Sequence, residues 1–206
     1  GGAGSKQLPS TGKKRRKTLT FYHDFSSPFS YLATTQIGRM AEAAGVKLKL
    51  KPVLLGALFK AIGTPDVPLF AMSEAKREYM LQDLGDWAKW WGVDFHFPEQ
   101  FPLRTVAALR VALQDPSTTP HIYRAAWVQG KNIGDDDVLI DVLDAAGFDG
   151  VALLAGTQEQ AIKQALRDNT EAAITEGACG VPTFTMGKQL WWGQDRLSLV
   201  EAALRS

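Results

Sequence analysis

The feature that most constrains the fold is a long interval of helical pattern, residues 55–177, between two short groups of strand-like segments. Before this interval, residues 18–25 are rich in threonine and aromatic side chains, and residues 46–55 alternate apolar and basic side chains. Both patterns are typical of strands. The segment between them, residues 26–45, has a proline suited to a first helical turn and ends at a glycine, which commonly stops a helix. This order predicts a strand–helix–strand unit with two parallel strands.

The interval itself repeats apolar residues at helical spacing. In residues 73–92 the repeat runs from Tyr79 through Leu84 and Trp87 to Trp91. Tryptophans at such spacing are core residues more often than substrate contacts. The same pattern recurs in residues 103–113, 121–131, 135–147 and 157–177. Three aspartates open the third of these segments, where carboxylates complement the dipole of a helix start.

Strand patterns return after the interval. Residues 181–187 and 188–193 are two short runs that meet at Gly187 and Lys188, as in a hairpin. An amphipathic helix is expected over residues 194–205. A strand–helix–strand start, a helical block and a strand–strand–helix finish together predict an α/β fold of the thioredoxin type, interrupted by an inserted all-helical domain.

The predicted fold has three parts. Residues 18–54 and 178–206 would form the thioredoxin-like domain, and residues 55–177 the helical insertion. Residues 1–17 are rich in glycine, serine and lysine and lack apolar periodicity. We therefore expect a disordered basic tail or a cloning remnant at residues 1–17.

Charge and cysteine content limit the classes of function. The chain has 23 Lys+Arg against 22 Asp+Glu, a formal net charge of +1, which argues against a general polyanion binder. For the basic run at residues 13–17, a solvated tail is favoured over a nuclear-targeting or nucleic-acid patch. The single cysteine, Cys179, cannot form an intrachain disulfide. We expect a small buried filler at this position rather than a redox sensor.

Membrane and metal sites are not predicted. No apolar run approaches the roughly 20 residues needed to span a bilayer, and the first segment lacks the apolar stretch of a secretory signal. We expect a cytoplasmic protein that binds neither membranes nor nucleic acid. The histidines His23, His96 and His121 lack the spacing of metal ligands. His23 could transfer protons at the end of the first strand, although a partly buried structural role is favoured.

The most informative motif is D-F-S-S-P-F-S-Y-L-A, residues 24–33, at a strand end that opens a helix. Free N–H groups and the helix dipole stabilise a negative charge at such a point. Thioredoxin-fold oxidoreductases place two cysteines here. This chain has Ser27 and Ser30 instead, which excludes dithiol exchange. The motif predicts an anion site that could hold a thiolate supplied by another molecule, unless Ser26, Ser27 and Ser30 only cap the helix.

Two further motifs are expected to lie beside Ser27. The turn at residues 180–183, G-V-P-T, precedes a strand where the thioredoxin fold has a cis proline, so we predict a cis Val181–Pro182 bond. The residue before that proline can pair its backbone with an extended peptide. Asp195 lies near the start of the last helix. It could be only a cap, or it could bind the amino group of a γ-glutamyl moiety.

Five motifs in order carry a resemblance to a known family. They are D-F-S-S-P-F-S-Y-L-A, L-L-G-A-L-F-K, F-P-L-R-T-V-A-A-L-R, G-V-P-T-F and W-G-Q-D-R-L. Together they resemble the bacterial 2-hydroxychromene-2-carboxylate isomerases and the related kappa-class glutathione transferases, over residues 18–204. The resemblance implies a DsbA-type thioredoxin-like fold with a helical insertion, a homodimer, and glutathione as the cofactor.

The resemblance also implies roles for individual residues. Ser27 matches the family's active-site serine, and Lys60 matches a lysine that would bind the substrate carboxylate or stabilise developing negative charge. The implied glutathione-binding residues are Val181, Pro182, Gln194 and Asp195. The implied substrate-binding residues are Phe29, Lys60, Thr64 and Arg104, of which Thr64 and Arg104 stand where the family often has asparagine.

The implied activity is glutathione-dependent isomerisation of a small aromatic carboxylate during degradation of aromatic compounds. In this activity a thiolate adds reversibly to an activated double bond and then leaves. One alternative is a kappa-type transferase that conjugates glutathione irreversibly. A second is a non-catalytic module that binds glutathione, and a nucleic-acid protein that uses the basic run is a distant third.

Overall fold

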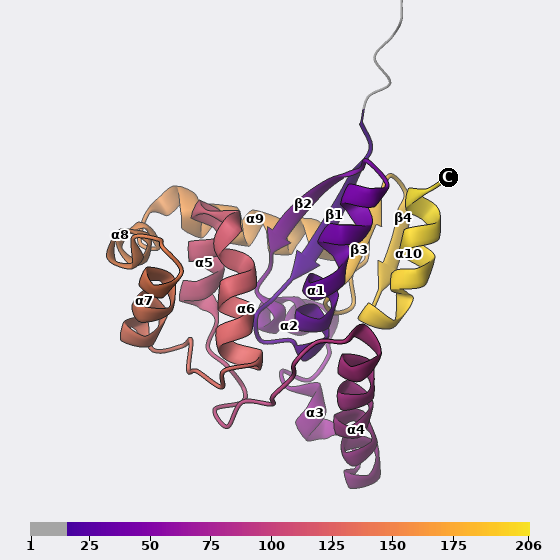
Figure 1. Cartoon of the computed structure of the whole chain (residues 1–206), viewed down its shortest axis with the longest axis horizontal. Coiled ribbons are helices and arrows are strands. Elements are labelled where there is room, and N and C mark those ends of the chain that lie inside the picture. Colours follow the sequence, from indigo (N-terminus) through magenta and orange to yellow (C-terminus); the bar gives the residue numbers. More distant parts are fainter. Residues whose placement is uncertain (1–15) are drawn as a thin grey trace, which may run out of the picture.

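The computed structural model describes residues 16–206 (Figure 1). The predicted tail, apart from its last two residues, lies outside the described residues. Those two, Arg16 and Lys17, contact the folded chain. The guanidinium of Arg16 and the ammonium of Lys17 donate hydrogen bonds to backbone carbonyls at 2.9 and 2.7 Å.

A mixed sheet of four strands forms the centre of the fold. The strands are β1 (Thr18–His23), β2 (Lys47–Pro52), β3 (Thr183–Met186) and β4 (Gln189–Trp192), in the order β2-β1-β3-β4. β1 and β2 are parallel, whereas β3 is antiparallel to both β1 and β4. Phe21 in β1 lies opposite Leu50 and Phe184, so apolar side chains align across the sheet. The predicted parallel pair and the hairpin at Gly187 are confirmed.

Helices make up the rest of the described chain. The long ones are α1 (Pro28–Ala43), α2 (Leu55–Ile62), α4 (Glu74–Trp91), α5 (Val106–Gln114), α6 (Thr119–Trp127), α7 (Asp136–Ala145), α9 (Gln160–Glu176) and α10 (Leu197–Leu204). Shorter ones are α3 (Pro68–Ala71), α8 (Gly150–Gly156) and the 3-10 turns η1 (Pro116–Thr118) and η2 (Gln194–Arg196). Between β2 and β3 the described chain contains helices and loops only, which confirms the predicted helical block.

Helices cover both faces of the sheet. On one face, α1 and α10 pack against it through a buried cluster that includes Leu19, Ile37, Phe184 and Leu197. On the other face, α2 and α9 contribute Leu58 and Ala173 to a cluster with Tyr22, Val53, Ala178 and Val181. α9 therefore covers the sheet, although it lies within the predicted insertion range. The division of the chain into domains stays a prediction.

The largest buried cluster joins the sheet layer to the remaining helices. Phe25 and Tyr31, from the β1–α1 segment, lie in this cluster with side chains of α4, α5, α6 and α7. The indole N–H of Trp127 in α6 donates to the Phe25 carbonyl at 2.7 Å. Full burial of one such large apolar side chain contributes about 1.5–3 kcal/mol. The insertion and the start of α1 thus share one core.

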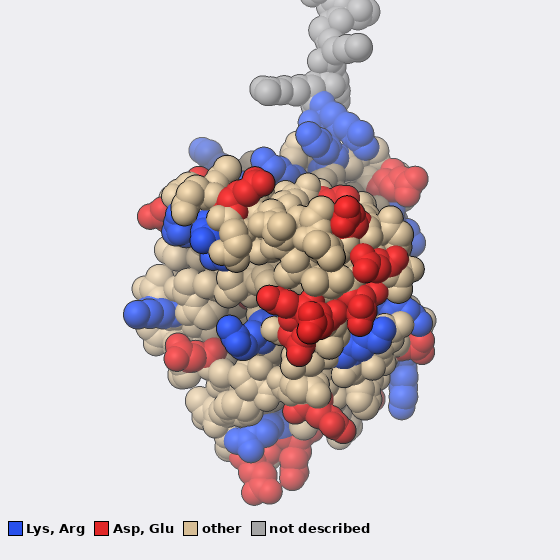
Figure 2. Space-filling view, turned by 90° about the vertical axis from the view of Figure 1, so that its left-hand side faces the viewer, with Lys and Arg blue, Asp and Glu red and all other residues tan. Residues whose placement is uncertain are grey.

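The far end of the helical part is acidic. Asp135 caps α7, and its carboxylate accepts hydrogen bonds from the Asp137 and Val138 amides at 2.9 and 3.3 Å. The aspartates at 135–137 therefore serve the helix start, as predicted. Figure 2 shows acidic side chains gathered on the face that α7 and α8 form.

α3 and α4 extend from the body of the molecule below the sheet (Figure 1). Of the expected apolar stripe in α4, Leu84 is buried and Trp87 and Trp91 are partly buried against the large core, whereas Tyr79 is not core. Tyr79 and Trp90 are 66% and 74% exposed. No helix in the described residues is both long and apolar enough to cross a membrane.

Candidate active site

Ser27 lies at the N-cap of α1 and is almost completely buried. Its Oγ accepts a hydrogen bond from the Ser30 amide at 3.1 Å, which caps the helix. The same hydroxyl donates to the Val181 carbonyl at 3.4 Å. The hydroxyl therefore caps the helix and also faces the G-V-P-T turn. Helix capping does not by itself exclude the place in an anion site that the sequence suggested for Ser27.

The turn at Val181 connects Ser27 to the last helix. The Val181–Pro182 bond is cis, as is Phe101–Pro102. The Pro182 carbonyl accepts a hydrogen bond from the Gly193 amide at 2.9 Å. Gly193 directly precedes Gln194 and Asp195, so the structure brings Ser27, the turn and η2 together.

Two glycines allow this close approach. A Cβ on Gly180 would lie 2.7 Å from the indole nitrogen of Trp192, so any side chain there would displace the ring. Gly193 has a φ of 110°, which other residues rarely adopt. Glycine at these two positions thus keeps the backbone beside Ser27 compact.

Gln194 and Asp195 differ in exposure. Gln194 is 2% exposed, and its amide oxygen accepts a hydrogen bond from the indole N–H of Trp91 in α4 at 2.8 Å. Asp195 has a half-exposed side chain 3.8 Å from Arg196. Partial burial and the charges of Asp86 and Asp195 raise the pKa of Asp83 in α4. Asp195 is therefore the accessible carboxylate of η2, in an acidic environment.

The predicted substrate residues lie on the helical side. Lys60 is exposed in the last turn of α2, and Thr64 is half-buried just after that helix. Arg104 is exposed just before α5, and Phe29 packs against the large core from the first turn of α1. In residues 16–206, no hydrogen bond or ion pair joins the side chains of Lys60 or Arg104 to Ser27.

Asp24 is a buried residue that sequence reasoning did not single out. Its carboxylate accepts hydrogen bonds from the Ser26 amide at 3.0 Å, the Thr105 hydroxyl at 2.7 Å and the Leu55 amide at 2.9 Å. Burial raises the pKa of the Asp24 carboxyl, and these hydrogen bonds oppose the rise. The one available signal was the position of Asp24 at the head of the serine motif, because its partners lie far along the chain.

His23 is fully buried beside Asp24. Its Nδ1 lies 2.7 Å from the Tyr123 hydroxyl in α6. Burial lowers the pKa of His23 from 6.5 to about 3, so the ring is neutral at ordinary pH. Burial and the charge of Asp24 raise the pKa of Tyr123. The geometry favours the structural alternative for His23 over proton transfer.

Cys179 corrects a prediction. The sequence suggested a small buried filler, but Cys179 is exposed and its thiol is free. The reason is its place in the loop between α9 and the G-V-P-T turn, where Ala178 fills the core instead.

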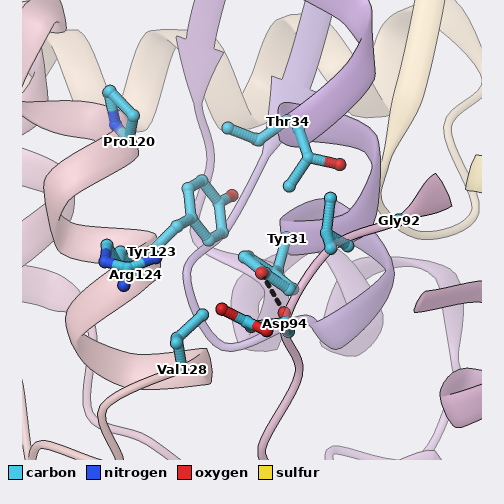
Figure 3. A pocket seen from close by; sticks show the side chains of 10 residues that line it. Tyr31, Thr34, Gly92, Asp94, Pro120, Tyr123, Arg124 and Val128 are labelled. Atoms are coloured by element: carbon cyan, nitrogen blue, oxygen red, sulfur yellow. Dashed lines mark hydrogen bonds between the residues drawn. The ribbon is translucent and has the colours of Figure 1, made fainter. Parts of the chain in front are cut away.

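A hollow of about 360 Å³ lies between α1, α6 and the segment that follows α4 (Figure 3). Its lining includes Tyr31, Thr34, Asp94, Tyr123 and Arg124. The Tyr31 hydroxyl donates to the Asp94 carbonyl across it. None of the predicted site residues lines this hollow, so it is separate from the Ser27 contacts.

Comparisons with known proteins agree with this architecture. A family model described as "DSBA-like thioredoxin domain" matches residues 18–205. A 2-hydroxychromene-2-carboxylate isomerase of Sphingobium xenophagum is 30% identical over 192 residues, which cover 91% of this chain and 98% of that protein. Glutathione S-transferase kappa 1 of Rattus norvegicus is 28% identical and covers 89% of each chain.

A solved structure is also similar. The structure of a 2-hydroxychromene-2-carboxylate isomerase superimposes with a TM-score of 0.82 at 26% identity. The match covers 91% of this chain and 94% of that one. The sheet order and the helical block are therefore shared with that protein.

Proposed function

We propose a function from the premise that this chain belongs to the DSBA-like thioredoxin family and, within it, to the 2-hydroxychromene-2-carboxylate isomerase family. The protein binds glutathione and isomerises a small aromatic carboxylate of the 2-hydroxychromene-2-carboxylate type. The observation that carries this proposal is the contact between the Ser27 hydroxyl, at the start of α1, and the Val181 carbonyl.

The groups at this end of α1 fit a peptide that bears a thiolate. The 3.4 Å contact from Ser27 is longer than an ordinary O–H···O hydrogen bond of about 2.7–2.8 Å, so the hydroxyl can turn toward a stronger acceptor. In the described chain the Phe29 amide donates no hydrogen bond, which leaves one N–H of the first helical turn for an anion. At Gly180 and Gly193 the backbone is bordered by the Trp192 indole and the Asp195 carboxylate, so Asp195 lies next to the turn.

Each residue then has a defined task. When bound, glutathione supplies a thiolate that can add to an activated double bond and leave again. Ser27 and the helix start favour the charged form of that sulfur, because hydrogen bonds to a charged group lower its pKa. Val181 offers its backbone to the extended peptide, and Asp195 accepts the α-amino group.

The substrate is held from the helical side in this proposal. The Lys60 ammonium binds the substrate carboxylate or stabilises negative charge that develops on the substrate. Phe29 supplies an apolar contact, and Thr64 and Arg104 supply polar contacts that select among aromatic carboxylates. The two relatives are similar over 91% and 89% of this chain, which supports this arrangement.

An anaerobic assay with and without glutathione tests the function. We expect a hydroxychromene carboxylate to isomerise only when glutathione is present, with glutathione recovered unchanged by NMR. Loss of glutathione into a conjugate would favour a transferase, which the similarity to the kappa enzyme makes the second candidate. Binding of glutathione without any turnover would indicate a binding module.

We also propose that the protein is a homodimer. Phe70 in α3 and Tyr79 and Trp90 in α4 are large exposed aromatic residues on the part of the fold that extends from the body. Exposed groups of this kind are typical of interaction sites. Sedimentation should give a dimer for the wild type and a monomer for Trp90→Glu. A wild-type monomer would contradict the proposal.

A further inference from the structure

The three segments that carry Ser27, Lys60 and Arg104 meet at the carboxylate of Asp24, which is 1% exposed. Ser27 caps α1, Lys60 lies in α2, and Arg104 directly precedes α5. The three helix starts come from positions far apart in the sequence. Asp24 is the one described carboxylate that bonds to the Leu55 amide of α2, to the N-cap residue of α5, and to Ser26, which directly precedes the N-cap of α1.

Asp24 caps α2 and binds the N-cap residue of α5. The N-cap of α2 is Leu54, which has no side-chain acceptor, and Asp24 Oδ2 accepts from the Leu55 amide instead. The N-cap of α5 is Thr105, whose hydroxyl caps nothing and donates to Asp24 Oδ1. An exposed cap such as Asp149 serves only its own helix, α8.

The contacts with α1 fix the loop that presents Ser27. Asp24 Oδ1 accepts from the Ser26 amide at 3.0 Å, and the Asp24 carbonyl accepts from the Ser27 amide at 3.1 Å. Asp24 therefore holds the residues on both sides of its own loop.

The negative charge of Asp24 has no cationic partner in residues 16–206. Three donors stabilise it instead, and one of them, the Leu55 amide, belongs to the first turn of α2. A buried carboxylate is costly, and an apolar core could close this junction without it. Its presence is better explained by the need to hold the three starts in one geometry.

We propose that Asp24 is a positioning residue, which acts through Thr105 and the Leu55 amide to fix Ser27 against the helices that carry or follow Lys60 and Arg104. This inference rests on the proposed function for the roles of those three residues. Misplacement of a catalytic group by about 1 Å can lower a rate by about 10²-fold. Asp24 therefore sets the rate without contact with the substrate.

Substitutions at Thr105 test the inference with little change in volume. Thr105→Val removes the hydroxyl that binds Asp24, whereas Thr105→Ser keeps it. Thr119→Val is the matched control, because Thr119 is equally buried but its hydroxyl has no partner in the described chain. With glutathione saturating, we expect Thr105→Val and Asp24→Asn to lower kcat by about 10–10²-fold, and the other two variants to stay within about 3-fold of wild type.

A second readout is independent of turnover. In a protein that carries Ser27→Cys and Cys179→Ser, the pH dependence of thiol alkylation gives the pKa of the thiol at position 27. We expect Thr105→Val to raise that pKa relative to Thr105→Ser, since the helix start is no longer held against the loop. Thr119→Val should leave it unchanged. If Thr105→Val does not fold, Thr105→Ala makes the same deletion.

The two readouts separate the possible failures. A wild type without turnover would overturn the proposed function, and the thiol pKa would still decide the role of Asp24. An unchanged thiol pKa in Thr105→Val would overturn the inference. Equal losses of kcat in Thr105→Val and Thr119→Val would do so as well, because loss of stability alone would then explain the effect.

Discussion

The proposed glutathione side and the proposed substrate side of the candidate site are built differently. On the glutathione side, Ser27, Val181 and Gln194 are buried, and hydrogen bonds join them to α1, the turn and α4. On the substrate side, Lys60 and Arg104 are exposed on helix termini, and in the described chain their side chains make no hydrogen bond. The first side is therefore set by folding, whereas the second can adapt to what it binds. Changes on the first side should affect kcat, and changes on the second should affect KM.

Ser27→Ala should have the largest effect on kcat of the variants that test this comparison. Without the hydroxyl, the pKa of the bound thiol should rise, so the thiolate fraction at neutral pH should fall. Loss of one preorganised donor typically costs about 10²-fold in kcat. We expect a drop of that size at pH 7, partial recovery at higher pH, and nearly unchanged glutathione affinity by calorimetry.

Ser30→Ala is the matched control for this experiment. Ser30 is fully buried, and its hydroxyl has no partner in residues 16–206, so its loss should leave the pH profile unchanged. Full activity in Ser27→Ala would move the role to the helix start. A covalent substrate adduct on Ser27, found by mass spectrometry, would overturn the proposed chemistry.

The buried His23 should make the free energy of unfolding sensitive to acid. The pKa of His23 is about 3 in the fold and 6.5 in an unfolded chain, so between these values the unfolded state binds more protons. The free energy of unfolding should therefore fall as pH falls from 6.5 to 5, by up to about 1.4 kcal/mol per pH unit. Urea titrations measure this slope. His23→Gln should flatten it, and His121→Gln, on the exposed surface, should not.

Asp195→Ala tests the half-exposed residue of the proposed glutathione side. A charge-assisted hydrogen bond to the amino group of glutathione is worth about 1.5–3 kcal/mol, so its loss should weaken affinity by about 10–10²-fold. The control is Asp149→Ala, which removes a cap at the start of α8. Both variants should lose about 1 kcal/mol of stability or less. Neither η2 nor α10 has a side-chain cap, so equal glutathione affinity in the two variants would contradict the proposed role of Asp195.

Lys60→Ala should give the smallest effect of the series. The exposed ammonium makes a screened contact, so we expect about a fivefold rise in KM for the aromatic carboxylate. Glutathione affinity and kcat should stay close to wild type. Lys89→Ala, in the last turn of α4, removes a similar exposed charge as a control. A large loss of kcat in Lys60→Ala would show that Lys60 belongs to the reacting centre.

Much of the fold could be predicted because its signals are local. Alternation marks the strands, helical spacing marks the central block, and the serine motif marks a strand end that opens a helix. The same signals predicted that Ser27, Val181 and Asp195 lie near one another, and the contacts from Ser27 to Val181 and from Gly193 to Pro182 agree with that placement. Each of these residues lies within a short motif, and the order of the motifs restricts how they can meet.

The features that could not be predicted depend on distant partners. Asp24 accepts a hydrogen bond from Thr105, which lies 81 positions away, and no local pattern in the sequence predicts that contact. Gln194 binds Trp91 over a separation of 103 positions. The exposure of Cys179 follows from Ala178 filling the core, which composition does not reveal. Local sequence identified the groups, and long-range packing decided what each one does.

The core shared by Phe25, Tyr31 and Trp127 limits how this protein could exchange parts with its relatives. The helical block is continuous in the chain, so recombination could move it as one piece. Such a piece would arrive with Trp127 but without Phe25 and Tyr31, whose side chains lie in the same buried cluster. A chimera that also carries the β1–α1 segment would keep this match. Variation in this lineage should therefore proceed by point changes at the exposed helix ends, more readily than by exchange of the whole block.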